Sequence, residues 1–368
     1  MDMTQIIKPT LLIDEKKARK NIADMAKRAR QAGVIFRPHF KTHQSAEIGN
    51  WFRDNGVTKI TVSSVDMAVY FAEHGWDDIT IAFPVNVRQL PTINQLAKKV
   101  TLNLLVESEI VIEHLHKHLT KQVNVWLEID AGYQRTGLPW DDLEAITAVS
   151  TLLQTSPSLH LSGLLLHAGN TYKGRGKTAV LDTHRQSLHH LHHVQNHLQQ
   201  QGLSAAISIG DTPACTLAND FAGIDEIRPG NFVFFDMMQV QIGACSIDQI
   251  AVAIACPVVA KYPARNCIAV YGGAVHHSKE ALVRDDGTVS YGRIALPTAN
   301  EWQVTSDENY IYSLSQEHGL VQASTHLMEQ IEVGDLLLVL PVHSCLTANL
   351  LKSYVTLGGK RIEMADIH

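Results

Sequence analysis

Residues 59–83 read KITVSSVDMAVYFAEHGWDDITIAF, and this stretch contains the pattern that decides the fold. Lys59–Ser63 and Asp78–Phe83 are short runs rich in β-branched and other apolar residues, whereas Val65–His74 has the apolar spacing of a helix. The stretch therefore predicts a strand, a helix and a second strand. Strands joined through helices pair in parallel and are covered on both faces, which fits the apolar character of these runs.

The same alternation continues on both sides of this stretch. The β-rich runs are Val34–Arg37, Lys59–Ser63, Asp78–Phe83, Thr101–Val106, Val123–Ile129, Leu161–Leu166, Ala205–Ile209 and Ile224–Arg228. The helical patterns are Lys16–Arg30, Ser45–Asn55, Val65–His74, Pro91–Lys99, Glu107–His118, Trp140–Leu153 and Lys177–Gln201. Eight such units over about 200 residues predict a (β/α)8 barrel of the α/β class. An open doubly wound sheet is the alternative, but no glycine-rich dinucleotide turn follows the first strands.

After Phe235 the helical periodicity fades and short β-like stretches follow, separated by Gly, Pro, Asp and Asn. These stretches are Ile250–Val259, Asn266–Val270, Gly319–Gln322 and Leu336–Leu340. They predict a separate antiparallel β domain. We expect the barrel over residues 10–240 and the β domain over residues 241–368, with Thr10–Ile13 as an additional strand that can pair with the second domain.

The composition narrows the functional class. The chain has 368 residues, with 31 Lys and Arg against 37 Asp and Glu, and this net charge of −6 argues against nucleic-acid binding. Its five cysteines form no Cys-x-x-Cys pair, which favours a reducing compartment. The first ten residues lack the apolar core of a signal peptide, and no apolar run approaches the roughly 18 residues that span a bilayer. We therefore expect a cytoplasmic protein with a small-molecule partner and neither nucleic-acid nor membrane partners.

Chemistry in a (β/α)8 barrel lies at the carboxyl ends of the strands. The first run leads into RPHFKTH, residues 37–43, where Lys41 lies between His39 and His43 and near Arg37. Neighbouring cationic or apolar groups lower the pKa of a lysine and make its amine nucleophilic, as a Schiff base requires. The alternative is a surface lysine in a loop.

Four further strand ends carry candidate groups. Arg135 lies in a glycine-containing loop that suits either an anion or a surface salt bridge, and His167 suits either chemistry or the core. Thr212 and the segment 228–231, RPGN, follow the last two runs, where barrels bind phosphate through backbone N–H groups. Thr212 followed by Pro213 also has the form of a helix N-cap with proline at the first helical position.

The second domain offers one compact pair of candidate metal ligands. His343 and Cys345 are two residues apart after an apolar strand, so an extended chain would place them on the same side. Imidazole and thiolate suit Zn2+, and two protein ligands leave positions open for water or substrate. The alternative is a buried cysteine beside an ordinary histidine. The histidine-rich stretch His184–His197 contains i,i+4 pairs but no carboxylate partner, and we expect no physiological metal there.

Together these motifs resemble those of the D-threonine aldolase/D-serine dehydratase family, fold-type III enzymes typified by alanine racemase. The resemblance covers nearly the whole chain. It rests on residues 37–43, 135–137 (RTG), 167–172 (HAGNTY), 228–234 (RPGNFVF) and 343–345 (HSC).

The resemblance implies a role for each matching residue. Lys41 would bind pyridoxal 5′-phosphate covalently and act as the catalytic base. The other residues implied in cofactor binding are Arg135 near the phenolic oxygen, His167 against the pyridine ring, Arg228 facing the pyridine nitrogen, Thr212 and the Gly230-Asn231 backbone around the phosphate, and Tyr172. His343 and Cys345 match zinc ligands of the eukaryotic-type D-serine dehydratases, whereas the aldolases more often have an acidic second ligand.

The implied activity is dehydration and deamination of a D-3-hydroxy amino acid to a 2-oxo acid and ammonia. Retro-aldol cleavage to glycine and an aldehyde stays open, because the same groups permit it. A racemase and a non-catalytic cofactor carrier are minor alternatives, and a second domain of about 130 residues argues against the carrier. We also expect a homodimer.

Overall fold

The computed structural model describes residues 3–367 and divides into two compact units. One unit comprises Ala23–Gly230, and the other comprises Asn231–Asp366 together with the N-terminal residues up to Ile22. Within the described residues, no helix is both long enough and apolar enough to cross a membrane.

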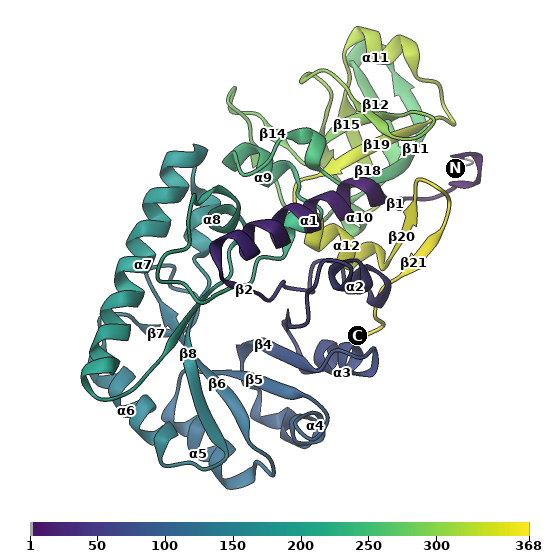
Figure 1. Cartoon of the computed structure of the whole chain (residues 1–368). Coiled ribbons are helices and arrows are strands. Elements are labelled where there is room, and N and C mark those ends of the chain that lie inside the picture. Colours follow the sequence, from purple (N-terminus) through teal and green to yellow (C-terminus); the bar gives the residue numbers. More distant parts are fainter. Residues whose placement is uncertain (1–2, 368) are drawn as a thin grey trace. The chain divides into compact units, whose positions relative to one another are not determined.

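The unit Ala23–Gly230 is built on a parallel sheet whose strands follow the order β2-β10-β9-β8-β6-β5-β4-β3 (Figure 1). The strands are β2 (Ile35–Phe36), β3 (Ile60–Val62), β4 (Asp78–Pro84), β5 (Thr101–Val106), β6 (Val123–Asp130), β8 (Leu159–Leu166), β9 (Ala206–Ile209) and β10 (Glu226–Ile227). A parallel bridge between His39 and Thr61 joins the two ends of this order. The ring is thereby closed, and the predicted (β/α)8 barrel is confirmed.

A helix follows nearly every strand of the ring. The helices are α1 (Glu15–Ala32) before β2, then α2 (Ala46–Arg53), α3 (Val65–Glu73), α4 (Leu90–Leu96), α5 (Glu109–His118), α6 (Leu143–Gln154), α7 (Gly176–Gln200) and α8 (Thr212–Leu217). The longest, α7, runs along the outside of the sheet (Figure 1). Two-residue β7 (Leu138–Pro139), in addition to the expected eight strands, pairs in parallel with the end of β6.

The interior of the barrel has a polar layer. Arg37, directly after β2, donates to Glu226 on the neighbouring strand β10 and to Asp78 on β4, both at 2.6 Å. These contacts link three strands of the barrel. An apolar cluster of Leu105, Trp126 and Leu165 lies in the same ring.

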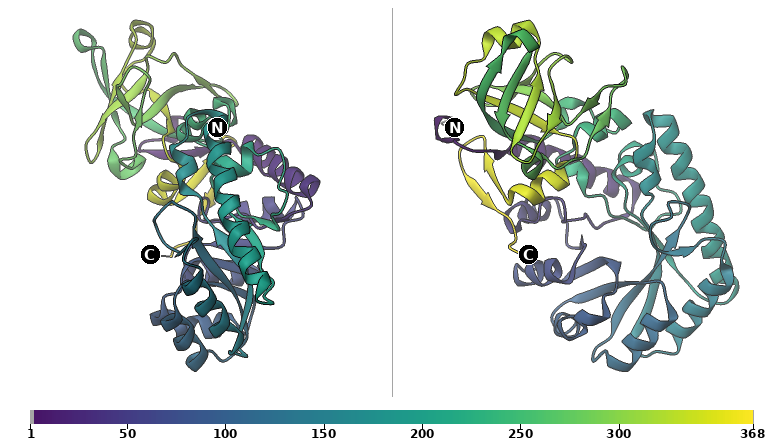
Figure 2. Two further views of the ribbon diagram at one scale, coloured as in Figure 1. Left: turned by 90° about the vertical axis from the view of Figure 1, so that its left-hand side faces the viewer. Right: turned by 180° about the vertical axis from the view of Figure 1, so that it is seen from behind.

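The other unit holds a ten-stranded sheet, which Figure 2 shows from two further directions. Its path is β12-β18-β17-β15-β19-β11-β1-β20-β21, with β16 paired to β15. The bounds are β1 (Thr10–Ile13), β11 (Val252–Tyr262), β12 (Cys267–Tyr271), β15 (Gly292–Pro297), β16 (Trp302–Val304), β17 (Tyr310–Leu314), β18 (His318–Gln322), β19 (Leu336–Pro341), β20 (Ser353–Thr356) and β21 (Arg361–Glu363). All its pairings are antiparallel except that between β1 and β20. The predicted antiparallel β domain is therefore confirmed.

Short helices interrupt this sheet where the sequence shows no helical periodicity. They are α9 (Met237–Ile242), α10 (Ala274–His277), α11 (Thr325–Gln330) and α12 (Ser344–Leu351). Elements of four to eight residues span at most about two turns, which is too short for an apolar repeat to show. The small hairpin β13 (Leu282–Val283) and β14 (Val289–Ser290) was likewise unpredicted.

Candidate active site

Lys41 lies in the turn that follows the His39–Thr61 bridge. Phe40 anchors this turn, because its ring is fully buried among Phe52, Phe71 and Trp76 at centroid distances of 4.9 to 5.0 Å. The backbone N–H of Lys41 donates to His39 Nδ1 at 3.4 Å. The chain around Lys41 is therefore fixed while the lysine side chain itself is only half-buried.

Two histidines share the electrostatic surroundings of Lys41. Burial lowers the pKa of both His39 and His167 well below the ordinary value, and the charges of Lys41, Arg135 and Arg228 lower it further. All five groups come from carboxyl ends of barrel strands. The structure thus brings together residues from four separate segments, with both imidazoles neutral and the cations close by.

The other two groups expected around Lys41 lie elsewhere. His43 is fully buried, stacks on Phe52 at 5.5 Å and has its pKa lowered by burial to about 3. Arg37 binds Glu226 and Asp78 in the interior. These contacts hold the side chains of Arg37 and His43 in the buried interior of the barrel unit.

Arg135 is presented by a loop that Asp130 organises. Oδ1 of Asp130 accepts from the backbone N–H groups of Gly132, Tyr133 and Gln134 at 2.8 to 3.0 Å. The half-exposed Arg135 side chain lies 3.5 Å from Oε1 of buried Glu128. Burial raises the pKa of Glu128, while Thr136 and Arg135 oppose the shift.

Arg228 is fully buried at the end of β10. Its Nη2 donates to Leu166 O at 2.9 Å and to Ser208 O at 3.3 Å. Its Nη1 lies beside Gly210, where a Cβ atom would come within 2.8 Å of it. Burial lowers the pKa of Arg228 to about 10, so the guanidinium stays charged at neutral pH.

The ends of β8, β9 and β10 meet around Thr212. Tyr172 Oη accepts from the backbone N–H of Thr212 at 3.3 Å. Within the described residues, Oγ1 of fully buried Thr212 has no hydrogen-bond partner. A Cβ atom on Gly230 would lie 2.8 Å from His39 O, so the backbone approaches closely there. Thr212 is not the N-cap: Asp211 caps α8 and accepts from Ala214 N at 2.8 Å.

Asn231 belongs to the other unit, and its side chain contacts residues there. Its Nδ2 donates to Asp236 Oδ2 at 2.6 Å and to Ser344 Oγ at 3.1 Å, and lies 3.7 Å from Cys345 Sγ.

His343 and Cys345 lie where β19 gives way to α12. His343 is the N-cap residue of α12 and Cys345 is in its first turn, so the extended chain that we expected between them is wrong. The two side chains nevertheless interact. Burial opposes protonation of His343, but the hydrogen bond and charge of Cys345, with Asp236 and Glu280, raise the pKa of His343 to about 9. Among residues 3–367, no group of three or more His, Cys, Asp and Glu side chains could hold a metal ion.

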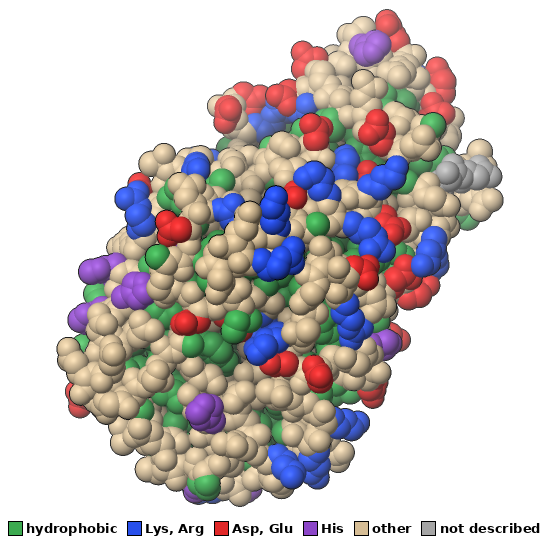
Figure 3. Space-filling view, in the orientation of Figure 1, with side chains coloured by type: hydrophobic (Ala, Val, Ile, Leu, Met, Phe, Trp, Pro, Cys, Tyr) green, Lys and Arg blue, Asp and Glu red, His purple; other side chains and the backbone are tan. Residues whose placement is uncertain are grey.

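The histidines of α7 pack against the barrel unit. The ring of His190 stacks on Trp140 at 3.8 Å, and His197 Nε2 lies 2.8 Å from Thr147 Oγ1. Buried His184 interacts with Asp211. Figure 3 shows other histidine side chains at the surface over α7.

The family model described as "Alanine racemase, N-terminal domain" matches residues 13–237, and the model described as "Putative serine dehydratase domain" matches residues 251–357. The chain belongs to the alanine racemase N-terminal-domain family.

Relatives in this family extend over the whole chain. D-serine dehydratase of Dictyostelium discoideum is 28% identical and covers 96% of this chain and 94% of its own. D-threo-3-hydroxyaspartate dehydratase of Delftia sp. HT23 is 28% identical and covers 95% of this chain and 94% of its own. The solved structure of the Delftia enzyme has a TM-score of 0.91, with 26% identity and 98% of each chain covered. That enzyme was also solved with a cysteine replaced by alanine, in the metal-free form, and with a histidine two positions earlier replaced by alanine.

The sequence did not point to Glu128 or Asp236, although both contact candidate site residues. Glu128 is a buried residue near the end of β6. The only signal in the sequence was its position shortly before the loop that carries Arg135. Asp236 contacts Asn231 and Ser344, but it follows an apolar run without any motif.

Proposed function

We propose that the protein is a pyridoxal-phosphate-dependent lyase that dehydrates and deaminates a D-3-hydroxy amino acid, such as D-serine or D-3-hydroxyaspartate, to a 2-oxo acid and ammonia. The observation that carries the proposal is the grouping of Lys41, Arg135 and Arg228 with two neutral histidines at the carboxyl ends of the barrel strands. The similarity to dehydratases over the whole chain supports it.

The barrel unit fits pyridoxal phosphate. Unpartnered Thr212 Oγ1, within the described residues, and the close backbone approach at Gly230 suit a phosphate. In our proposal Tyr172, Thr212, Gly230 and the backbone of Asn231 hold the phosphate, with Lys41 as the covalent attachment. Arg135 would face the phenolic oxygen, His167 the ring and Arg228 the ring nitrogen. When bound, the cofactor serves as the electron sink for carbanion chemistry at the substrate Cα.

The protein groups would then divide the proton transfers. Lys41 Nζ would take the proton from the substrate Cα, because it is the amine that lies among these strand ends. His39 and His167, kept neutral by burial, add no positive charge beside that amine. Charged Arg228 would offer Nη1 as a hydrogen-bond donor to the ring nitrogen, and a donor there would favour the unprotonated nitrogen.

We propose that His343 and Cys345 hold a divalent metal, most simply Zn2+. Their mutual contact and their ligand types fit this ion, and two protein ligands leave open positions as in catalytic sites. A Lewis acid stabilises a departing hydroxide, which is otherwise a poor leaving group. The spacing of His343 and Cys345 matches that of the histidine and cysteine replaced in the variants of the Delftia enzyme, one of which is metal-free.

Aldolase cleavage is the second candidate function, since aldolases are among the relatives. The thiolate ligand Cys345, which resembles the dehydratase pattern, favours dehydration. We further propose that the protein is cytoplasmic and has neither nucleic-acid nor membrane partners, as its acidic charge and unpaired cysteines suggest. We also propose a homodimer.

An end-product assay distinguishes these functions. The enzyme is incubated with D-serine, D-3-hydroxyaspartate and D-threonine and with their L-enantiomers, with and without a chelator, in deuterated water. We expect 2-oxo acid and ammonia from a D-substrate in the metal-loaded enzyme. After metal removal we expect Cα deuterium exchange without product. Glycine and aldehyde as the main products would establish the aldolase, and full ammonia release after verified metal removal would exclude the metal's role.

A further inference from the structure

Asp236 caps two helices at once. Its Oδ1 accepts from Gln239 N at 3.0 Å, which caps its own helix α9. Its Oδ2 accepts from Ser344 N at 2.9 Å and from Ser344 Oγ at 3.2 Å, which satisfies the first N–H of α12, 108 residues later in the chain. Asp236 is fully buried, so these contacts are made out of water.

This arrangement relieves His343 of the usual task of an N-cap residue. An N-cap side chain ordinarily accepts from the N–H groups of the first turn. Over the described residues, His343 makes no such cap hydrogen bond, because Asp236 supplies the acceptor from outside the helix. The imidazole of His343 is thereby left to face Cys345.

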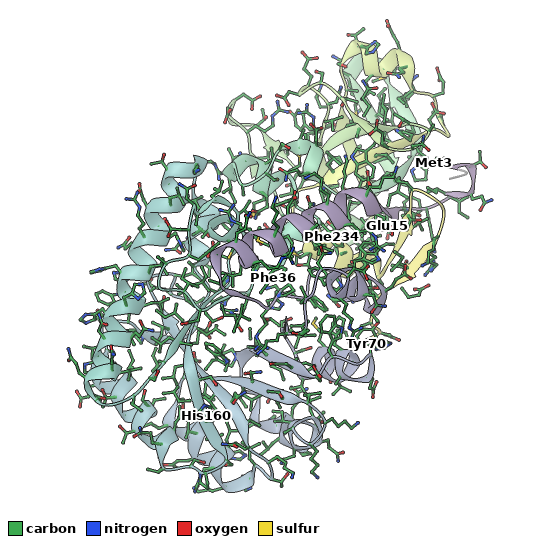
Figure 4. All side chains as sticks on the ribbon, viewed as in Figure 1. Met3, Glu15, Phe36, Tyr70, His160 and Phe234 are labelled. Carbon is green, nitrogen blue, oxygen red and sulfur yellow. The ribbon has the colours of Figure 1, made fainter. Side chains whose placement is uncertain are left out.

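Asn231 completes the arrangement on the side of the thiol. Its Nδ2 lies 2.6 Å from Asp236 Oδ2 and 3.7 Å from Cys345 Sγ, within reach of an N–H···S hydrogen bond. The segment between Asn231 and Asp236 is held in the core, because the ring of Phe234 (labelled in Figure 4) packs on the ring of buried Tyr354 at a centroid distance of 5.5 Å. An amide donor directed at the sulfur holds the side chain of Cys345 in one orientation.

We propose that Asp236 and Asn231 are positioning residues for the metal ligands: Asp236 fixes the first turn of α12, and Asn231 orients the sulfur of Cys345. This inference rests on the proposed metal site at His343 and Cys345. Groups that orient metal ligands typically contribute about 10- to 100-fold to metal affinity.

The test measures Zn2+ affinity of the full-length protein by competition with a chromophoric chelator, for the wild type, Asn231→Ala and Asp236→Asn. Asn231→Ala removes the donor to sulfur and leaves the backbone in place. Asp236→Asn keeps the size but cannot accept from both Gln239 N and Ser344 N. We expect about 10- to 100-fold weaker Zn2+ binding in each variant.

The matched control is Asp142→Asn, which weakens a similar cap, that of α6 by Asp142 on Ala145 N at 3.0 Å, in the barrel unit. It should lower the Tm without changing Zn2+ affinity. Wild-type affinity in Asn231→Ala, with zinc lost in Cys345→Ala, would overturn this inference alone. Zinc retained in Cys345→Ala, or no tight binding by the wild type, would overturn the proposed metal site and the inference with it. Asn231→Ala keeps the test valid if Asp236→Asn does not fold.

Discussion

The guanidinium of Arg228 is held in place by Ser208. Nε of Arg228 donates to Ser208 Oγ at 2.6 Å, and that hydroxyl donates onward to Glu226 Oε1 at 2.8 Å. Glu226 in turn binds Arg37, so Arg228 is one end of a buried polar chain that links the neighbouring strands β9, β10 and β2. Removal of the Ser208 hydroxyl should therefore lower the stability of the protein and change the position of Arg228 in the proposed cofactor site.

Ser208→Ala should destabilise the protein by about 1–3 kcal/mol, because it leaves the buried Arg228 Nε without its acceptor. Urea unfolding measures the change. The control is Ser150→Ala, which removes an equally buried hydroxyl that donates only to Ile146 O in its own helix. An equal decrease in the free energy of unfolding in the two variants would show that the hydrogen bonds through Ser208 stabilise the protein no more than an ordinary buried hydroxyl does.

Glu128→Gln should remove the pH-dependent loss of stability that comes from ionising a buried carboxyl. Burial raises the pKa of Glu128 in the folded state, so the folded protein holds this proton more tightly than the unfolded chain. The contribution of Glu128 to stability is therefore full below the unfolded pKa and is lost as the pH rises through the folded one. Unfolding free energies of wild type and Glu128→Gln should diverge over that window, the wild type falling more steeply.

The matched variant for this comparison is Glu113→Gln, which removes an exposed carboxylate of α5. Parallel stability curves for wild type and Glu128→Gln from acid to neutral pH would refute the role of burial.

Gly230→Ala should weaken both folding and cofactor retention. A Cβ atom there would lie 2.8 Å from His39 O and 3.0 Å from Thr42 Oγ1, so the backbone beside Lys41 must shift, at a cost of about 1–3 kcal/mol. Loss of the visible cofactor absorption on dialysis reports retention. Gly358→Ala is the control, because its Cβ would meet only Thr356 Oγ1 at 3.6 Å. Cofactor retention at the wild-type level in Gly230→Ala would mean that the close backbone approach at Gly230 is not part of the phosphate site.

Cys345→Ala should lose stoichiometric zinc by elemental analysis, whereas the double variant His189→Ala/His193→Ala should retain it. The reason is that Cys345 interacts with His343, whereas the ring of His193 packs edge-on against Trp140 at 5.8 Å. The opposite pattern would move the metal to α7.

The barrel could be predicted because its strands are short apolar runs between amphipathic helices, and those patterns are local. Leu336–Leu340 was recognisable in the same way. The helix α12 was not, since eight residues with exposed Leu346 and Leu350 carry no clear apolar face. The relation of His343 to Cys345 was therefore expected from an extended chain, although a helical turn produces it.

The candidate site was predictable where the rule of strand ends applies, as for Lys41 and Arg135. The same rule could not separate His39 from His43, because two histidines on either side of a lysine look alike until the turn sends one into the aromatic core. Asp236 was out of reach for a different reason. Its partner Ser344 lies 108 residues away, and no local pattern reveals a cap supplied from outside a helix.

The central claim, that Lys41 carries pyridoxal phosphate in a lyase site, is tested most directly by borohydride reduction of the purified holoenzyme followed by peptide mapping. We predict a single pyridoxyl adduct on the peptide that contains Lys41, and loss of the visible absorption band and of activity in Lys41→Ala. An adduct on a different lysine, or a Lys41→Ala variant that still binds the cofactor covalently, would contradict the account.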